Sequence, residues 1–184
     1  MKRLLSILIA AALLTAPCLA ESFDLSSMTD LELGRLSQSI DQTLHARWNS
    51  DAAGIAERLY DSIAADHPDA LCPGFDGNSA VFFGDLHVSL YITDTTCSVT
   101  VSPCAADDLP AAYDVLALFA RAVLPELTDF DSGALLRAIT PTDSGLLFDA
   151  TGASCTQSTA YGGIPYTITI QLDGDDYSVE LSIG

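Results

Sequence analysis

The sequence predicts an α+β fold in which one or more antiparallel sheets pack on about four helices. Apolar residues recur at steps of three and four in the first third of the chain and again over residues 109–140, which is typical of helices. In the intervening and final segments they alternate with polar residues, which is typical of strands. Runs of helices and runs of antiparallel strands favour separate helical and sheet layers.

The first 20 residues have the pattern of a secretory signal peptide. Lys2 and Arg3 are followed by an apolar run up to Leu14 and by a small-residue cleavage site that ends at Ala20. The run is shorter than the roughly 20 residues that a membrane-spanning helix needs. We therefore expect export to the periplasm or the medium, no membrane insertion after cleavage, and a single mature domain over residues 21–184.

Two helices are expected before the first strand. Thr29 and Glu32 have the spacing of a capping box, in which each side chain accepts a hydrogen bond from the other residue's backbone amide. A stripe of apolar residues follows at helical spacing, and we expect it to pack in the core: Leu33, Leu36, Ile40, Leu44 and Trp48. Asn49 to Asp51 interrupt this helix, and the same spacing resumes over residues 52–65.

Three short strands are expected over residues 81–101. A two-residue turn at Gly84-Asp85 would place Val81 opposite Val88, and a turn over residues 93–96 would place Leu90 opposite Val99. All apolar side chains would then share one face, which a slip of one residue would destroy. The pattern therefore predicts an antiparallel meander.

The segment 109–124 predicts a helix that is apolar around most of its circumference, because only Asp114 and Arg121 are charged. Such a helix is normally covered on more than one side. We therefore expect it to be the central helix of the fold. A fourth helix is expected over residues 129–140.

The C-terminal region predicts a β-hairpin. A strand is expected around Leu147, whereas residues 151–163 predict no definite element beyond a short strand around Cys155. From residue 164 to the end, apolar and polar residues alternate on both sides of the Asp173-Gly174 dipeptide, which is typical of a type I′ hairpin turn.

Two registers keep the apolar residues of this hairpin on one face. A turn at Asp173-Gly174 pairs Ile168 with Val179, and a turn one residue later sets Asp173 against Asp176. We expect the first register, because directly opposed like charges destabilise a sheet.

Four cysteines remain after removal of the signal peptide, namely Cys72, Cys97, Cys104 and Cys155. An even number in an exported chain favours two disulfide bonds over four buried thiols. An extended strand would hold Cys97 and Cys104 roughly 23 Å apart, whereas bridged Cα atoms lie within about 7 Å. We expect Cys72 with Cys97 and Cys104 with Cys155, and the alternative is Cys72 with Cys104 and Cys97 with Cys155.

The charge balance restricts the partners. The mature chain would hold five arginines against 25 acidic residues, a net charge of −20. Such a field repels phosphate backbones and anionic lipid head groups, so nucleic acid is not expected as a partner and a charged partner should be basic.

Recognised catalytic motifs are missing from the sequence: it has no HExxH, glycine-flanked serine, phosphate loop or Cys-x-x-Cys, and we expect no cofactor. His87 and Ser102 are candidates for a hydroxyl and base pair, because the expected meander makes them neighbours on its outer face. Asp173, Asp175 and Asp176 are candidates for a calcium site. We favour a non-enzymatic module that binds a protein partner or itself; the alternatives are a small hydrolase and a calcium-stabilised protein.

Overall fold

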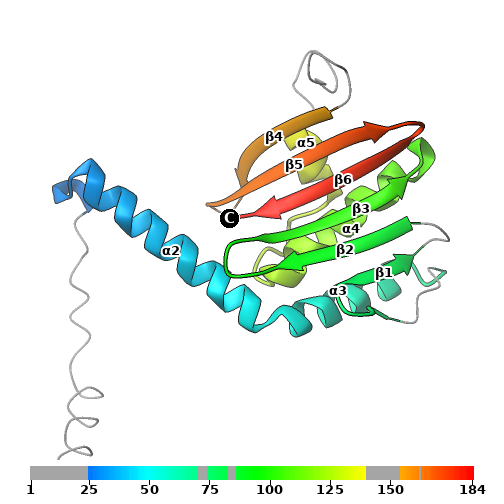
Figure 1. The fold of residues 1–184 in the computed structure, drawn as a ribbon, viewed down its shortest axis with the longest axis horizontal. Helices are drawn as coiled ribbons and strands as arrows, with labels where there is room; N and C mark the ends of the chain where they lie inside the picture. The colour runs from blue at the N-terminus through cyan, green and yellow to red at the C-terminus, as the bar shows by residue number, and fades with distance from the viewer. Residues whose placement is uncertain (1–24, 70–73, 83–85, 140–153, 162) are drawn as a thin grey trace, which may run out of the picture. The chain divides into compact units, whose positions relative to one another are not determined.

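The computed structural model describes residues 25–69, 74–82, 86–139, 154–161 and 163–184 (Figure 1). The chain divides into two compact units, Met1–Gln38 and Ser39–Gly184, and the boundary falls inside helix α2 (Asp30–Ser50). The expected signal peptide with its cleavage site, the strand around Leu147, and Cys72 lie outside the described residues.

The described part of the first unit consists of a 3-10 turn, η1 (Leu25–Ser27), and the first turns of α2. The expected capping box is confirmed. The Thr29 amide donates to the Glu32 carboxylate at 2.8 Å, and the Glu32 amide donates to the Thr29 hydroxyl oxygen at 3.3 Å. The Thr29 hydroxyl also donates to the Glu32 carboxylate, at 2.8 Å. The two hydrogen bonds that the carboxylate accepts from Thr29 stabilise its charged form, so they lower the pKa of Glu32.

The expectation that the apolar stripe of α2 packs in the core is wrong for Ile40, which belongs to the second unit. Leu33 and Leu36 are only half-buried, and Ile40 is 53% exposed. Only the last turns reach the core, where Leu44 packs against it and Trp48 is buried. Helical periodicity predicts an amphipathic helix, but it does not reveal what covers the apolar side.

The second unit contains, among the described residues, one six-stranded antiparallel sheet in the order β1-β2-β3-β6-β5-β4. The strands are β1 (Ser79–Phe82), β2 (Leu86–Ile92), β3 (Cys97–Cys104), β4 (Ser154–Tyr161), β5 (Ile164–Asp173) and β6 (Asp176–Ile183). Pairing of β3 with β6 joins the expected meander and the expected hairpin edge to edge. The two fragments that the sequence predicts are therefore parts of a single sheet.

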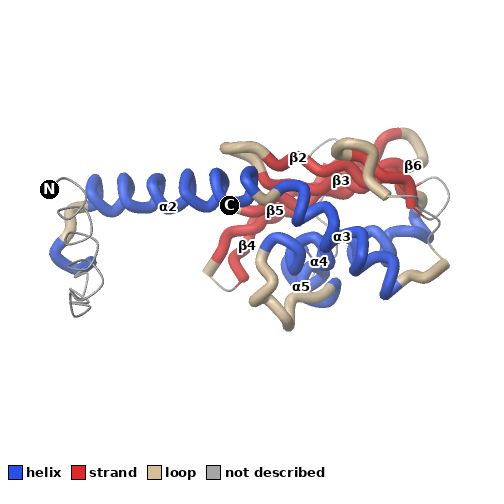
Figure 2. Tube along the Cα trace, turned by 90° about the horizontal axis from the view of Figure 1, so that it is seen from below, coloured by secondary structure: helices blue, strands red, loops and turns tan. Residues whose placement is uncertain are grey.

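Three helices of this unit form a layer on one face of the sheet (Figure 2). They are α3 (Ala52–Asp66), α4 (Leu109–Val123), which follows the 3-10 turn η2 (Ala106–Asp108), and α5 (Ser132–Ile139). Helix α4 contacts β3 and β6 as well as α3 and α5. With α2, the described residues hold four α-helices and an antiparallel sheet, so the α+β class is confirmed.

The core lies between the sheet and this helical layer. Helix α4 buries ten of its residues, and Phe119 is completely inaccessible to solvent. Alternate residues of the four middle strands face it and are buried: Leu86, Val88, Leu90, Val99, Val101, Ile168, Ile170, Val179 and Leu181. This alternation is the period-two pattern of a sheet that has one face in the core.

The register between β2 and β3 is as expected, with Leu90 opposite Val99 and Val88 opposite Val101. The register between β1 and β2 differs by one residue, because Ala80, not Val81, stands opposite Val88. The alternation of apolar and polar residues does not determine the register of β1, because the sequence has three consecutive apolar residues here, Val81 to Phe83. Buried Ala80 takes the inward position.

The register expected for the C-terminal hairpin is wrong, and the rejected alternative is present. Ile168 pairs with Leu181, Asp173 stands opposite Asp176, and the turn lies at Gly174-Asp175. Both registers bury the same apolar side chains of β5 and β6, so only the residues at the turn of the hairpin distinguish them. There the carboxylates are exposed to water, which weakens their repulsion. Gly174 has φ +68°, so it adopts the left-handed conformation that the turn requires without steric conflict.

Candidate functional site

The candidate pair His87 and Ser102 lies on the sheet face that points away from the helices. His87 is exposed on β2 and Ser102 is half-buried on β3. The neighbour of His87 on β1 is Val81, where the expected register had placed Phe82. No hydrogen bond joins the two candidate side chains in the described part of the chain. Neither residue lines either of two cavities in the second unit, one of about 160 Å³ beside α5 and one of about 210 Å³ beside α3 and α4. The structure therefore gives the hydrolase hypothesis no support.

The three candidate calcium ligands lie at the exposed tip of the β5–β6 hairpin. Asp173 and Asp176 are directly opposed, and Asp175 is in the turn between them. Within the described ranges, no three His, Cys, Asp or Glu side chains are arranged to hold a metal ion. The calcium hypothesis therefore has no geometric basis in this hairpin.

Cys97, Cys104 and Cys155 are buried free thiols. Cys97 and Cys104 lie at opposite ends of β3, as the sequence predicts. Cys155 is on β4, three strands away from β3 in the sheet, which corresponds to about 14 Å between the strands.

Both expected sets of disulfides join Cys155 to a cysteine of β3, and neither set fits this sheet, because bridged Cα atoms lie within about 7 Å. The sequence did not reveal that β5 and β6 lie between these strands. Pairing that involves Cys72 stays a prediction, since Cys72 is outside the described residues.

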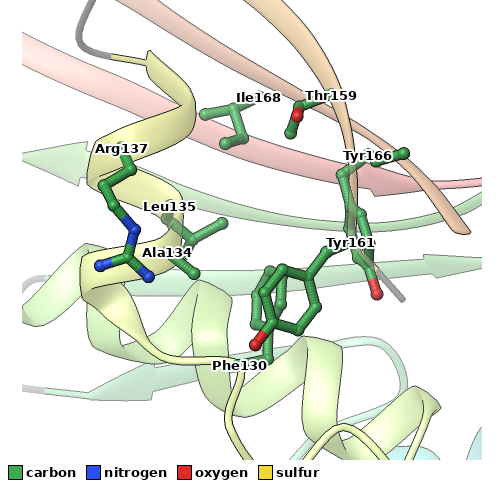
Figure 3. A pocket seen from close by; sticks show the side chains of 9 residues that line it. Phe130, Ala134, Leu135, Arg137, Thr159, Tyr161, Tyr166 and Ile168 are labelled. Atoms are coloured by element: carbon green, nitrogen blue, oxygen red, sulfur yellow. The ribbon is translucent and has the colours of Figure 1, made fainter. Parts of the chain in front are cut away.

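A cavity of about 160 Å³ lies in the second unit, between α5 and the strands β4 and β5 (Figure 3). Its walls come from three elements and from the loop that precedes α5. The lining residues are Phe130, Ala134, Leu135, Arg137, Thr159, Ala160, Tyr161, Tyr166 and Ile168. Most of these side chains are aromatic or aliphatic, with few polar groups among them.

Three aromatic rings form one wall of the cavity. The Phe130 ring stacks on the Tyr166 ring with centroids 5.0 Å apart, and it meets the Tyr161 ring edge to face at 4.8 Å. Local sequence explains the positions: Tyr166 is an inward residue of β5, and Tyr161 is the last residue of β4. Both geometries are favourable for aromatic pairs, so the wall is held together by its own contacts.

Two carboxylates and one guanidinium act on the Tyr161 hydroxyl. Interaction with the Asp129 carboxylate is the main cause of a raised pKa of Tyr161, Asp131 raises it further, and Arg137 lowers it. Asp131 also accepts a hydrogen bond from the Ala134 amide at 2.8 Å, which caps α5. All three charges therefore act on the same phenol.

Arg137 and Asp131 form a loose ion pair, with 4.0 Å between guanidinium nitrogen and carboxylate oxygen. Both side chains are mostly exposed, so the pair contributes little to stability. The Tyr166 hydroxyl, in contrast, is buried without a hydrogen-bond partner among the described residues. Burial, chiefly, raises the pKa of Tyr166 by disfavouring the charged phenolate.

A second, more polar cavity of about 210 Å³ lies beside α3 and α4. His67 and Asp114 approach to 3.7 Å across it, and Arg121 and Asp66 to 3.9 Å. Its charged groups are thus engaged with one another. The aromatic cavity has the more apolar lining, which is typical of small-molecule sites, and we take it as the candidate site.

Sequence reasoning missed the aromatic cavity because its three rings come from distant positions. Phe130 lies in a loop, and Tyr161 lies in the segment 151–163, for which no definite element was expected. One signal was present: the Gly162-Gly163 dipeptide lies between Tyr161 and Ile164, and such a pair favours a two-residue hairpin turn. Tyr161 and Ile164 indeed pair across β4 and β5.

No helix within the described residues has both the length and the apolar character to cross a membrane. Comparisons of the chain with protein-family models, with curated proteins and with solved structures find no match. The geometry of the aromatic cavity is therefore the main guide to the function of this chain.

Proposed function

We propose that this chain is an exported, acidic, non-enzymatic binding module, and that the aromatic cavity between α5 and the β4–β5 hairpin is its ligand site. The observation that carries the proposal is the wall of three rings in mutual contact. Small-molecule sites are typically concave, lined by aromatic and aliphatic side chains, and supplied with only a few polar groups. The cavity has this composition.

The charge of the chain supports a binding role for the rest of the surface. The full sequence has a formal net charge of −18. A protein partner would therefore present a basic surface, and nucleic acid would be repelled. Association with a second copy is less favoured, because two such chains repel each other.

The ligand site is tested by filling the cavity. Ala134 lies on α5 and lines the cavity, so Ala134→Leu keeps a good helix former and puts a larger side chain into the space. Wild type and variant are titrated with small phenyl compounds that carry an amine, a hydroxyl or a carboxylate, and binding is followed by calorimetry. We expect at least one compound to bind the wild type and to bind Ala134→Leu at least about tenfold more weakly.

The matched control is Ala46→Leu, at an exposed position of α2. This variant should bind as the wild type does. Absence of binding by every compound, or equal binding to wild type and Ala134→Leu, would refute the cavity as the ligand site.

Export is tested separately on the natural host. The mature protein should be found in the envelope or the medium with Glu21 as its first residue. Recovery of the chain inside the cell with residues 1–20 still attached would contradict the exported location.

A further inference from the structure

We infer that the ligand of the aromatic cavity is a small organic cation of the alkylammonium or quaternary ammonium class. This inference rests on the proposed function, because it names the chemistry of the same site. It follows from the rings in the wall, from the charges around it and from the size of the space.

The rings provide the surface that such cations recognise. An aromatic ring carries negative charge on its faces, and a cation placed over a face is attracted to it. Phe130 and Tyr166 are inclined by only 27°, whereas Phe130 and Tyr161 meet at 81°. The wall therefore presents rings in two orientations, and Figure 3 shows Tyr161 and Tyr166 across the cavity from Ala134 and Leu135.

The charges favour a cation over an anion. The Asp129 and Asp131 carboxylates lie close enough to the Tyr161 hydroxyl to raise its pKa. Arg137 lines the cavity, and its guanidinium lies 4.0 Å from the Asp131 carboxylate, which offsets its charge. Asp129 adds a second carboxylate near Tyr161, and the net charge of the chain is also negative.

The Asp129 carboxylate near the Tyr161 hydroxyl strengthens the preference. A carboxylate beside a phenol hydroxyl polarises the phenol, which increases the electron density of its ring. Tyr161 is half-buried, so a ligand can reach the ring from solvent. Tyr161 thus provides an aromatic surface that lies near a negatively charged carboxylate.

The size of the space selects a small head group. An apolar cavity of about 150 Å³ holds a benzene molecule, and this cavity is about 160 Å³. A trimethylammonium group with a short chain is of that size. A neutral molecule of the same shape would contact the same rings but would gain nothing from the carboxylates.

The test compares three probes of one shape on the full mature chain: choline, 3,3-dimethyl-1-butanol and 3,3-dimethylbutanoate. The first carries a positive charge where the second has a neutral quaternary carbon, and the third is an anion. Calorimetry at low salt should show choline binding about tenfold more tightly than the neutral alcohol, with the anion weakest.

Variants locate the effect. Tyr161→Leu removes a ring from the wall and should abolish the preference for choline. Tyr161→Phe keeps the ring but loses the hydroxyl group near Asp129, so it should retain part of the preference. The matched control is Tyr91→Leu at an exposed position of β2, which should bind as the wild type does. Melting curves check that each variant is folded.

The outcomes separate the inference from the proposed function. Equal binding of choline and the neutral alcohol, both weakened by Ala134→Leu, would overturn the cation inference and leave the ligand site in place. Choline binding that Tyr161→Leu does not change would also overturn the inference, because the cation would then lie elsewhere. No binding of any probe, together with no binding in the phenyl series, would overturn both.

Discussion

Cys97 and Cys104 illustrate how burial governs the chemistry of single residues in this protein. Burial raises the pKa of Cys97 to about 12. Burial, with the nearby charges of Asp108 and Asp176, raises the pKa of Cys104 to about 11. Because the thiolate is the nucleophilic form, both side chains are poor nucleophiles near neutral pH. Their positions in the sheet explain their burial without any catalytic role.

The first prediction follows from these raised pKa values. The unfolded thiols lose their protons near pH 9, whereas the folded thiols keep theirs to about pH 11 and 12. The folded state therefore binds more protons in this window, and its stability is full below pH 9 and falls as the pH rises from 9 towards 12.

The measurement is the denaturant midpoint at pH 7, 9 and 10.5 for the wild type and for the double variant Cys97→Ala/Cys104→Ala. The double variant should lose less stability between pH 9 and 10.5 than the wild type does. An identical loss in the two proteins would show that the thiols are not the groups responsible.

The second prediction concerns Phe119, a completely buried ring of α4. Phe119→Asp should unfold the second unit, because removal of a buried ring alone costs about 3 to 5 kcal/mol, out of a typical stability of about 5 to 15 kcal/mol. The introduced carboxylate adds a desolvation penalty. Circular dichroism should show no cooperative melting, whereas Tyr91→Asp at an exposed site should melt within a few degrees of the wild type.

At the level of the elements, the sequence specified what depends on local pattern and left open what depends on tertiary packing. The capping box at Thr29 and the pairing of Leu90 with Val99 were predictable, because each rests on neighbouring residues and a single periodicity. Which residues of β1 face the core was not predictable, because consecutive apolar residues fit both faces of the sheet. The register between β5 and β6 was not predictable either, because two alternative turn positions place the same side chains in the core.

Helix α2 shows the same distinction for a helix. Its apolar stripe was predictable, but its exposure was not, since periodicity carries no information about what packs against the stripe. The contrast with α3 is direct: Leu59 of α3 is completely buried, while Ile40 of α2 is 53% exposed. Two helices with similar patterns thus have different environments.

The third prediction uses this contrast. Ile40→Ala should change the free energy of unfolding by less than about 0.5 kcal/mol, as is usual for surface substitutions. Leu59→Ala should lower it by about 2 to 5 kcal/mol, because it leaves a cavity in the core. Urea unfolding of both variants measures the difference. A loss for Ile40→Ala that equals the loss for Leu59→Ala would mean that the stripe of α2 is covered in solution.

For the whole molecule, the excess of acidic residues is the feature that acts at the longest range. The net charge of −18 was evident from the sequence and predicts attraction of cations. The aromatic cavity was not evident, because Phe130 and the two tyrosines come together only through the order of the strands and the position of α5. Composition therefore favours a cationic ligand, and only the fold reveals the cavity that we propose as its site.

The fourth prediction concerns the salt dependence of binding. Raising NaCl from 10 to 500 mM shortens the screening length from about 30 Å to a few ångströms, which removes most of the long-range attraction. Choline should therefore bind several-fold more weakly at high salt, and 3,3-dimethyl-1-butanol should bind equally at both concentrations. Equal salt dependence of the two probes would show that the charge of the protein does not contribute.

The central claim is that a ligand occupies the cavity between α5 and the β4–β5 hairpin, and the nuclear Overhauser effect tests it most directly. With choline bound, its methyl protons should show intermolecular effects to the ring protons of Phe130 and Tyr161 and to the methyl group of Ala134, which surround the cavity. The ring of Tyr91, exposed on β2, should show none. Effects to Tyr91 or to other surface groups, with none to Phe130, Tyr161 and Ala134, would contradict the account.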